Sequence, residues 1–555
     1  MNLANCTGSE SSVRSAASAS STSSALAIKP HVPSISADSK ILVVGAGSSG
    51  KAAYELCSFL QERGGIYAFE LWDPHKDIYA EDKRLDLAEQ LSFEHYTIGV
   101  LSPGISPFSQ EYAQAKSLCD ELISEVELAW RIYPRPDRWL AITGTNGKTT
   151  TTALTTHIFE HSNRRVCAVG NIGKACSKAV LEYLQDCERA YKEGQKASSQ
   201  NPASQEDIST QAPSAQKTSI QNLLEFARKS DEAPYLVAEL SSFQLFLCSS
   251  FNPCAAALLN ISPDHLEWHK SQEHYCASKF KLFEDAPATR ALILREQELQ
   301  DYPKLAQSLA HSHAAICVLL KENTQTSKAA VQESSSSDYA YVQEQDLFLE
   351  CSGEKCRLSS AANLKIKGRH NLENCLMASY LAYSCGLSIE EIREAITSFT
   401  ALEHRIEFVA QIDSCSFYND SKATNIDAAT QALGAFDDKP LIILLGGHDK
   451  GADLSAFAAR VLARCKAAIC FGEASELFYA ALSKAQPEQL QSKTCKLIKA
   501  SNLKEAFDLS LKELAAGDCV VLSPACSSYD EFNNYQERGR FFKSLVLENV
   551  QKGGE

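Results

Sequence analysis

Length, composition and charge limit the classes of protein to which this chain can belong. It has 555 residues, with 54 Lys and Arg against 69 Asp and Glu, so its formal net charge is −15. At roughly 100–200 residues per domain, this length predicts three or four domains. No run approaches the ~18 apolar residues of a membrane span, and an acidic chain without a long basic run argues against nucleic-acid binding. We therefore expect a soluble multidomain protein, and a local pocket for an anionic substrate stays open.

Twenty cysteines are scattered through the sequence without a Cys-x-x-Cys pair. Several lie within apolar runs, as Cys57, Cys167 and Cys470 do. This pattern is typical of buried reduced thiols rather than of a disulfide framework or a zinc site. The N-terminal segment lacks the apolar core of a signal peptide. We therefore expect a cytoplasmic protein.

Three stretches are polar and of low complexity. Residues 1–38 are rich in Ser and Ala, which predicts a disordered tail; a transit peptide is the alternative, although Arg14 is the only arginine there. Residues from about 192 to 219 and from about 321 to 338 are interpreted as surface insertions, because the entropy of loop closure grows slowly with length. Function is expected elsewhere in the chain.

Short apolar runs alternate with helical patterns through the remainder of the chain. The runs are residues 41–44, 139–142, 235–238, 255–259, 441–445 and 519–522. Such alternation predicts β-α units and parallel sheets, in which ligands gather at the carboxyl ends of the strands. Each of these runs is followed by a polar cluster. The sequence therefore predicts an α/β fold with functional groups at the strand ends.

The strongest motif directly follows the run at 139–142 and precedes a helical segment. It consists of Thr143, Gly144, Thr145, Asn146, Gly147, Lys148, Thr149 and Thr150. Its glycines let backbone N–H groups face a phosphate, Lys148 supplies a charge, and Thr149 offers a hydroxyl to Mg²⁺. It is shorter than the common phosphate loop, whose first glycine would fall at Ile142. Because a strand and a helix flank it, we interpret it as an ATP site rather than a chance turn.

A second glycine motif, Gly45 to Gly50, follows the first predicted strand, and Asp73 ends a later one. This pattern is typical of a nucleotide diphosphate on a helix N-terminus, with the carboxylate on a ribose or base. A nicotinamide dinucleotide is one possible ligand. Another nucleotide diphosphate is favoured because the chain also carries the ATP loop.

Further polar residues follow other strand runs. Glu239 ends one run, where it is placed to hold the Mg²⁺ of ATP. Asp264 and His265 follow the next run, and a histidine there is either structural or a ligand. Lys279 lies in a helical segment, and its local sequence does not distinguish it from a solvated surface lysine.

The last third of the chain adds a candidate anion site. Asn371 and Asn374 share one helix face, although helix capping by Asn371 is an alternative. Turns at 419–425, 446–451 and 523–528 each follow an apolar run, and two of them carry a lysine, which favours a concave anion site. His404-Arg405 precedes these turns and is interpreted as a hinge with a phosphate-binding arginine.

This set of motifs, in this order, resembles the Mur ligase family of bacterial cell-wall synthesis. With the number of the first residue in parentheses, the motifs are SPGI (102), TGTNGKTT (143), GNIG (170), ELSSFQL (239), DH (264), AxK (277), GRHNxxN (368), HRIE (404), NDSKATN (419), GGxDKG (446) and SPACSSYDEFNNYQERG (523). They cover the chain from about Lys40 to its end, outside the tail and insertions. TGTNGKT and HN mark a superfamily that includes folylpolyglutamate synthases. NDSKATN and SPACSSxDxF mark a narrower subfamily.

The resemblance implies three α/β domains. A Rossmann-like domain at 39–122 would bind a UDP-linked substrate. A central domain of the P-loop ATPase type at 123–400, with a parallel sheet, would bind ATP, and a Rossmann-like domain at 401–555 would bind an amino acid. Two Mg²⁺ ions are implied, and Lys279 is expected to be carbamylated, which converts its amine into a carboxylate-like ligand.

Family roles carry over to matching positions of this sequence. The UDP moiety would meet Ser48, Ser49, Asp73, Ser102 and Gly104, and the muramoyl-alanine end Asn171, Ser241 and Gln244. The metal ligands would be Thr149, Glu239, His265 and Lys279, and adenine and ribose would meet Asn371 and Asn374. The phosphates would meet Lys148, Arg405, Asp420 and Lys422, and D-glutamate would meet Thr424, Lys450 and Ser528. The expected catalytic residues are Lys148, His265, Lys279 and Lys422, and Tyr535 of the substrate site stands where the family usually has Phe.

The implied activity is an ATP-dependent amide ligase, a monomer, that joins D-glutamate to UDP-N-acetylmuramoyl-L-alanine through an acyl phosphate. Three alternatives remain: a ligase of the same superfamily for another amino acid or for folate, an NAD oxidoreductase, and a nucleotide-binding regulatory module. The first would lack SPACSSYDEF. The second would leave Lys148, Glu239 and His265 without a role, and the third would not need charged turns in the last third.

Overall fold

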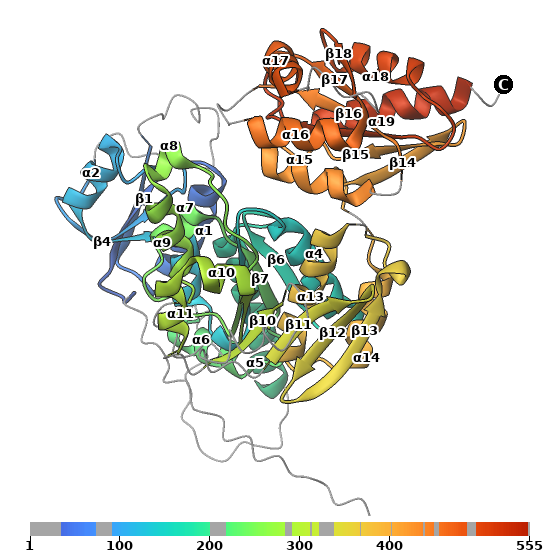
Figure 1. Ribbon diagram of the computed structural model, residues 1–555. Coiled ribbons are helices and arrows are strands. Elements are labelled where there is room, and N and C mark those ends of the chain that lie inside the picture. The colour runs from blue at the N-terminus through green and yellow to red at the C-terminus, as the bar shows by residue number, and fades with distance from the viewer. Residues whose placement is uncertain are drawn as a thin grey trace, which may run out of the picture.

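The computed structural model describes most of the chain as three α/β units (Figure 1). The described residues are 35–73, 91–199, 218–283, 291–310, 314–320, 338–366, 368–400, 402–436, 439–448, 454–485 and 495–552. Most of the predicted tail, parts of both predicted insertions, and Lys450 lie outside them. No helix among the described residues combines the length and apolar character needed to cross a bilayer.

The N-terminal unit is a four-stranded parallel sheet with the order β2-β1-β3-β4. Its elements are β1 (Lys40–Val44), α1 (Ser48–Glu62), β2 (Ala68–Trp72), β3 (Tyr96–Leu101), α2 (Gln110–Leu118) and β4 (Cys119–Ser124). Ile41 and Val43 pack in the same cluster as residues of α1, whereas Leu42 and Val44 pack with Ala115 of α2. Helices thus cover both faces of β1, which explains its unbroken apolar sequence.

The central unit contains a nine-stranded sheet with the order β13-β12-β11-β10-β9-β8-β5-β7-β6. Its first elements are α3 (Glu125–Ile132), β5 (Trp139–Thr143), α4 (Lys148–His161), β6 (Val166–Gly170), α5 (Cys176–Ser199), α6 (Ile220–Lys229), β7 (Tyr235–Glu239), α7 (Ser242–Phe246), β8 (Ala255–Leu258), α8 (Leu266–His269) and α9 (Gln272–Phe280). The later ones are β9 (Ala291–Arg295), α10 (Glu296–Asp301), α11 (Pro303–Ala310), β10 (Ala315–Leu319), β11 (Asp338–Gln343), β12 (Asp346–Cys351), β13 (Glu354–Ser360), α13 (Arg369–Ser384) and α14 (Ile389–Ser398). α5 continues to Ser199, into the region interpreted from sequence as an insertion.

The central sheet is mostly parallel, as predicted, and departs from this at one edge, where β12 pairs antiparallel with β11 and β13. A tight turn joins β12 to β13 through Ser352 (φ 52°) and Gly353 (φ 83°). Buried and half-buried residues alternate along β12 instead of forming one apolar run. The sequence does not indicate this half-exposed hairpin, because its strands contain no continuous apolar run.

The C-terminal unit is a six-stranded sheet with the order β14-β15-β19-β16-β17-β18, in which only β14 runs antiparallel to its neighbour. Its elements are β14 (Glu407–Ile412), β15 (Cys415–Asn419), α15 (Ile426–Leu433), β16 (Leu441–Gly446), α16 (Ser455–Arg464), β17 (Cys465–Phe471), α17 (Ser475–Ala485), β18 (Lys496–Lys499), α18 (Leu503–Lys512), β19 (Cys519–Ala525) and α19 (Tyr535–Lys552). Together with the other two sheets, this establishes the α/β class.

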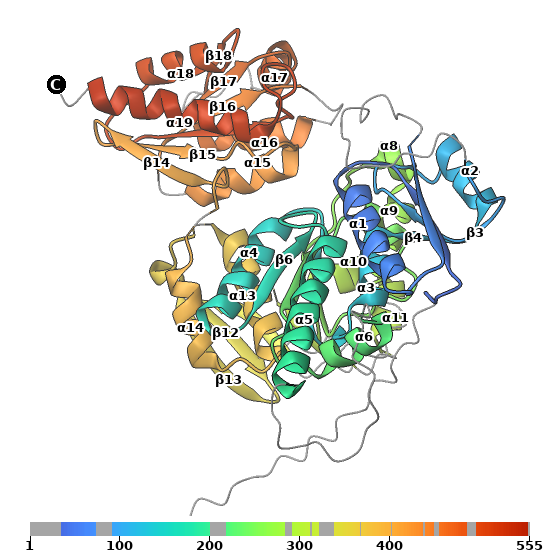
Figure 2. The ribbon, with the colours of Figure 1, turned by 180° about the vertical axis from the view of Figure 1, so that it is seen from behind.

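The three units are joined in different ways. α1 packs against α5, so that Leu56 and Leu60 share one apolar cluster with Val180 and Leu184 of the central unit. The C-terminal unit has apolar clusters of its own and stands apart from the other two in both views (Figures 1 and 2). The N-terminal unit is therefore fixed to the central one by a common core, whereas the C-terminal unit is attached mainly through the chain between α14 and β14.

Candidate functional site

The phosphate loop lies between β5 and α4. Gly144 has φ 149° and Gly147 has φ 85°, conformations that side-chain-bearing residues rarely adopt. α4 begins at Lys148, directly after Gly147, so its first N–H groups face the space in front of the loop. A Cβ at residue 147 would lie 2.5 Å from Oδ1 of Asn374. The loop therefore needs glycine both for its backbone shape and for its contact with α13.

Lys148 folds back onto this loop. Its Nζ donates to the carbonyl oxygens of Gly144 at 2.8 Å and Thr145 at 2.7 Å. Burial lowers the pKa of Lys148, whereas Glu239 and Asp264 raise it. The loop is also tied to the next strand end, since Asn146 N–H donates to Oδ1 of Asn260 at 2.8 Å. In this form the Lys148 ammonium is bound by main-chain oxygens of the loop itself.

Glu239, at the end of β7, has the chemistry of a cation ligand. Asn171 Nδ2 donates to its Oε1 at 3.0 Å. Its Oε2 is buried and has no hydrogen-bond partner in the described part of the chain. A buried carboxylate oxygen without a partner is costly, and Mg²⁺ prefers such oxygen ligands. The chemistry of the unpartnered Glu239 oxygen therefore fits a cation ligand.

Lys279 contacts the phosphate loop, whereas His265 lies in the turn after β8 beside Asp264. His265 has φ 54°, and its Nε2 is 3.5 Å from Oδ2 of Asp264. Lys279 is 1% exposed, so the alternative of a solvated surface lysine is wrong. Its Nζ donates to the Gly144 carbonyl at 2.8 Å. Burial holds the pKa of Lys279 well below its usual value, with Lys148 adding to the effect, which favours the neutral amine.

Asn371 and Asn374 face the phosphate loop from α13. Asn374 Nδ2 donates to Oδ1 of Asn371 at 3.3 Å. The helix is capped by Gly368 without a side-chain hydrogen bond, so capping by Asn371 is wrong. The two amides line a small cavity of about 40 Å³ between the central and C-terminal units, together with Asn146, Gly147, Thr150, His370, Arg405, Ile406, Asp420, Lys422, Ala423 and Ala428. This space exceeds that of one water molecule but falls far short of a typical ligand pocket.

The C-terminal unit contributes two cations to this cavity. Lys422 Nζ donates to Oγ1 of Thr149 at 3.1 Å, and its ammonium lies 5.2 Å from the ring centroid of Tyr535. Burial lowers the pKa of Lys422 to about 8, with Arg405 and Lys148 acting in the same direction. Arg405 Nε is buried without a hydrogen-bond partner among the described residues. Lys148, Arg405 and Lys422 thus lie near one another, with Glu239 and Asp420 as neighbouring carboxylates, and such a cluster of cations suits a polyanion.

Asp420 lies beside these cations at the end of β15. Its Oδ1 accepts from the N–H of Ile406 at 3.2 Å and its Oδ2 from the hydroxyl of Ser523 at 2.7 Å. Burial raises its pKa to about 7, despite the opposing effect of Ser523 and Arg405. Both carboxyl oxygens of Asp420 are therefore held by hydrogen bonds, one from the residue that precedes β14 and one from a residue of β19.

Sequence reasoning missed Arg538. This residue is fully buried at the start of α19. Its guanidinium donates to the hydroxyl and carbonyl of Ser421 at 3.0 and 2.9 Å, and to the carbonyls of Ser527 and Cys526, each at 3.0 Å. It therefore ties the turn after β15 to the turn after β19. Only its place in the ERG segment of the last motif could have drawn attention to it.

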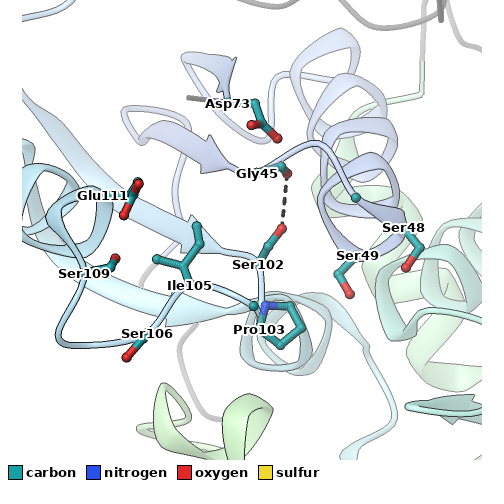
Figure 3. A pocket seen from close by; sticks show the side chains of 12 residues that line it. Gly45, Ser48, Ser49, Asp73, Ser102, Pro103, Ile105, Ser106, Ser109 and Glu111 are labelled. Atoms are coloured by element: carbon teal, nitrogen blue, oxygen red, sulfur yellow. Dashed lines mark hydrogen bonds between the residues drawn. The ribbon is translucent and has the colours of Figure 1, made fainter. Parts of the chain in front are cut away.

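A separate cavity of about 480 Å³ lies at the carboxyl edge of the N-terminal sheet (Figure 3). Its lining includes all five residues predicted for the UDP moiety: Ser48, Ser49, Asp73, Ser102 and Gly104. Asp73 Oδ2 accepts from the N–H of Ala46 at 2.5 Å, and the Ser102 hydroxyl donates to the Gly45 carbonyl at 3.2 Å. The glycine motif and two other strand ends thus form one pocket rimmed by hydroxyl groups.

The remaining predicted residues are distributed as follows. Ser241 and Gln244 form a capping box at the N-terminus of α7, where Gln244 Oε1 accepts from the N–H of Ser241 at 3.0 Å. Thr424 and Ser528 follow β15 and β19, which are adjacent strands, whereas Lys450 lies outside the described residues. Tyr535 begins α19 beside Lys422. The structure therefore brings part of the phosphate loop, Asn371, Asn374, Arg405, Asp420 and Lys422 to one interface and leaves the UDP candidates in a second pocket.

Fold and site together define a nucleotide-binding α/β enzyme of the phosphate-loop class. The description "Mur ligase middle domain" matches residues 142–382, and "Mur ligase, glutamate ligase domain" matches residues 404–526. The chain belongs to the Mur ligase family.

Curated relatives match almost the whole chain, and three of them share the name UDP-N-acetylmuramoylalanine--D-glutamate ligase. The protein of Thermoanaerobacter sp. (strain X514) is 32% identical over 92% of this chain and 98% of its own length. Those of Acidobacterium capsulatum and Aquifex aeolicus are 34% and 33% identical, over 92% and 91% of this chain and 96% and 98% of their own lengths. A solved UDP-N-acetylmuramate-alanine ligase of Thermotoga maritima is 13% identical with a TM-score of 0.49, covering 93% and 99% of the two chains.

Proposed function

We propose that this chain is an ATP-dependent ligase that joins D-glutamate to UDP-N-acetylmuramoyl-L-alanine, in the cytoplasmic synthesis of peptidoglycan precursors. The observation that carries the proposal is the meeting of Lys422, from the C-terminal unit, with Thr149 of the phosphate loop at 3.1 Å. This contact brings the amino-acid-binding unit of a Mur ligase against the nucleotide site. The relatives named above support D-glutamate as the amino acid.

The reaction follows from the charges in the site. The terminal carboxylate of the muramoyl-alanine substrate attacks the γ-phosphorus of ATP, ADP leaves, and an acyl phosphate forms. Lys148, Lys422 and Arg405 stabilise the negative charge that spreads over the transferred phosphoryl group. The free amine of D-glutamate then attacks the acyl carbon, its nitrogen loses one proton to solvent and keeps the other as the amide N–H, and phosphate leaves from the tetrahedral intermediate. The products are the amide, ADP and phosphate.

Two magnesium ions are proposed, one held by Thr149 and Glu239 and one by His265 and Lys279. When bound, they supply Lewis-acid stabilisation of the phosphate oxygens. The unpartnered buried oxygen of Glu239 supports the first ion. For the second, Lys279 is proposed to react with carbon dioxide and become a carbamate, releasing one proton. Its nearly complete burial supports this proposal, because burial favours the neutral amine that attacks carbon dioxide.

The substrates are assigned to the two pockets. The UDP moiety is proposed to bind in the N-terminal cavity through Ser48, Ser49, Asp73, Ser102 and Gly104, with Asn171, Ser241 and Gln244 towards the muramoyl-alanine end. Adenine and ribose are assigned to Asn371 and Asn374, and the phosphates to Gly144, Thr145, Asn146, Gly147, Lys148, Thr149, Thr150, Arg405, Asp420 and Lys422. D-glutamate is assigned to Thr424, Lys450 and Ser528, with Tyr535 beside Lys422.

Movement of the C-terminal unit is part of the proposal. A cavity of about 40 Å³ does not admit a nucleotide, so the unit must move away before ATP enters and return afterwards. His404 and Ile406, between α14 and β14, have φ angles of 67° and 46°, which mark this short connection as unusual backbone. Closure would also keep water from the acyl phosphate. X-ray scattering curves of the free chain and of the chain with an ATP analogue and substrate should therefore differ; identical curves with and without them would contradict it.

One assay tests the activity. Phosphate release from ATP should require UDP-N-acetylmuramoyl-L-alanine and D-glutamate together, and the amide should form in equal amount. Release with another amino acid but not with D-glutamate would select a different ligase of the superfamily. Sedimentation of the purified chain tests the accompanying proposal that it is a monomer.

The carbamate has its own test. Lys279→Ala should be inactive and should recover part of its activity when short carboxylic acids are added, because they replace the missing carboxylate. Lys281→Ala is a matched control, since Lys281 is two residues away and its Nζ donates to the carbonyls of Phe246 and Cys248 rather than to the phosphate loop. Absence of recovery in Lys279→Ala would count against carbamylation.

A further inference from the structure

His269, the last residue of α8, is a buried histidine to which the proposed reaction assigns no role. It is 0% exposed. Its Nε2 lies 2.8 Å from the Ser242 hydroxyl, and its Nδ1 lies 3.0 Å from Nδ1 of His274. A neutral imidazole has one donor and one acceptor nitrogen, and either tautomer satisfies one contact as donor and the other as acceptor. Neither ring nitrogen is therefore left to bind a metal or a substrate.

The partners of His269 belong to segments that carry the proposed metal ligands. Ser242 begins α7, three residues after Glu239. His274 lies in α9, five residues before Lys279. His269 itself lies four residues after His265, and its N–H donates to the carbonyl of His265 at 3.1 Å. One imidazole thus connects the three segments that bring Glu239, His265 and Lys279 to the phosphate loop.

Aromatic packing fixes this imidazole in place. The Phe243 ring stacks on His269 with centroids 5.6 Å apart, and the same Phe243 ring lies 4.7 Å from that of His265. The Tyr275 ring meets His269 edge-on at 5.4 Å, and the Tyr275 hydroxyl is 2.8 Å from Oγ1 of Thr145 in the phosphate loop. The orientation of His269 is therefore coupled to groups that contact the nucleotide site directly.

We propose that His269 is a positioning residue which, through Ser242 and His274, holds the strand-end segment of Glu239, the turn of His265 and the helix of Lys279 in the arrangement that binds the divalent cations. This inference rests on the proposed function for its substrates. A positioning role differs from a packing role, because losing it should weaken cation binding more than it lowers folding stability.

The primary test uses His269→Phe and Ser242→Ala. Phenylalanine keeps a ring in the buried site and removes both hydrogen bonds, whereas Ser242→Ala removes one partner and leaves the ring. Binding of Mn²⁺ to each protein with a non-hydrolysable ATP analogue is measured by electron paramagnetic resonance. We expect Mn²⁺ to bind at least fivefold more weakly in both variants. The Mg²⁺ concentration for half-maximal phosphate release should rise in parallel, while the KM for the UDP substrate changes less than twofold.

His157→Phe is the matched control. His157 Nε2 lies 2.8 Å from the Ser398 hydroxyl, the same pair of groups at the same distance, but it joins α4 to α14 away from the proposed ligands. This variant should lose thermal stability without changing the Mn²⁺ affinity. The double variant of His269→Phe and Ser242→Ala should bind Mn²⁺ no more weakly than His269→Phe alone, because both changes remove the same hydrogen bond.

Unchanged Mn²⁺ affinity in Ser242→Ala, or an equal loss in His157→Phe, would overturn the inference. Ser242→Ala decides the matter if His269→Phe does not fold. The outcome is separable from that of the proposed function, because Mn²⁺ binding is measured without turnover. A wild-type chain that binds Mn²⁺ with the ATP analogue but forms no D-glutamate amide would refute the function alone.

Discussion

The N-terminal cavity and the nucleotide site differ in how much of each is already built. The first has about 480 Å³ of space and a lining contributed by one unit, whereas the second has about 40 Å³ and lies between two units. The N-terminal unit shares an apolar cluster with the central unit, so its pocket is held by a common core. The nucleotide site depends on the position of the C-terminal unit, which has separate clusters.

The N-terminal cavity and the nucleotide site also differ in the charged residues that line them. Hydroxyl groups and backbone dominate the N-terminal cavity, and its described lining includes Asp73 and Glu111 but no lysine or arginine. The nucleotide site gathers Lys148, Arg405 and Lys422, and burial lowers the pKa of each of the three. Burying like charges together is costly, and a bound polyanion would offset that cost. We therefore expect the N-terminal cavity to bind its substrate in the form seen here. The charged nucleotide site is expected to be completed only when the other substrate binds.

The largest expected effect is a loss confined to the nucleotide site. Lys148→Ala removes a charge that stabilises the transferred phosphoryl group, so phosphate release should fall by roughly a thousandfold. Titration calorimetry of the UDP substrate should give an affinity within twofold of wild type, since Lys148 does not line the N-terminal cavity. Activity within tenfold of wild type would refute the role of Lys148.

Two glycine substitutions compare how each site responds to an added methyl group. Gly147→Ala places a methyl group 2.5 Å from Asn374 Oδ1 at φ 85°, so kcat/KM for ATP should fall by roughly 10–100-fold. Gly104→Ala, in the N-terminal cavity, meets no protein atom within 4 Å, so the kcat and the KM for ATP should change less than threefold, and any loss should appear in the KM for the UDP substrate, whose proposed space the methyl group enters. Steady-state kinetics with each substrate varied in turn measures both. Equal tolerance at the two positions would mean that the nucleotide site is as adaptable as the cavity.

Asp73→Ala tests the preformed pocket. The Asp73 carboxylate accepts the Ala46 N–H and lines the cavity, so its loss should raise the KM for the UDP substrate by about tenfold, equivalent to about 1.4 kcal/mol. The kcat and the KM for ATP should stay within twofold of wild type, because binding is lost equally in the ground and transition states. A fall in kcat of similar size would instead connect Asp73 to the chemistry.

The smallest effect concerns stability at the charged site. Burial raises the pKa of Asp420 from 3.8 to about 7, so the folded state favours the protonated acid. The resulting stability is fully present below about pH 4 and is lost as the pH rises through about 7. Asp420→Asn keeps the shape without the charge and should therefore raise the Tm of the C-terminal unit by roughly 3–6 °C at pH 8.

The same comparison at pH 5 supplies the control. There the acid is protonated in the folded state but ionised in the unfolded chain, so part of the penalty remains, and the difference in Tm between the two proteins should shrink to roughly 40% of its value at pH 8. Calorimetry at both pH values measures it. A constant difference across this range would show that Asp420 does not carry the buried charge.

The local sequence is sufficient to predict candidate site residues that stand directly after a strand. The phosphate loop, Glu239 and Asp420 were all located from the polar residues that end apolar runs, because parallel strands bring those ends to one edge. The α/β class followed from the same alternation. The β12–β13 hairpin was missed because its strands are half-exposed and alternate, so they contain no apolar run.

Other features depend on contacts between distant residues. Lys279 resembles a surface lysine in its own helix, yet α9 packs so that its amine reaches the Gly144 carbonyl, 135 positions away in the chain. Arg538 becomes a connector only because β15 and β19 are neighbours in the sheet. His269 gains its partners in the same way, from α7 and α9.

The sequence by itself determined the class of fold, the family, the phosphate loop and the residue types that surround it, because these depend on local patterns and ordered motifs. Only the tertiary structure decided which side chains are buried, which charges are adjacent and which pocket is already open. Burial and distance set the pKa of Lys279, the crowding of Lys148 with Lys422, and the contact between Lys422 and Thr149. These quantities arise from the packing of segments far apart in the chain, and no local pattern encodes them.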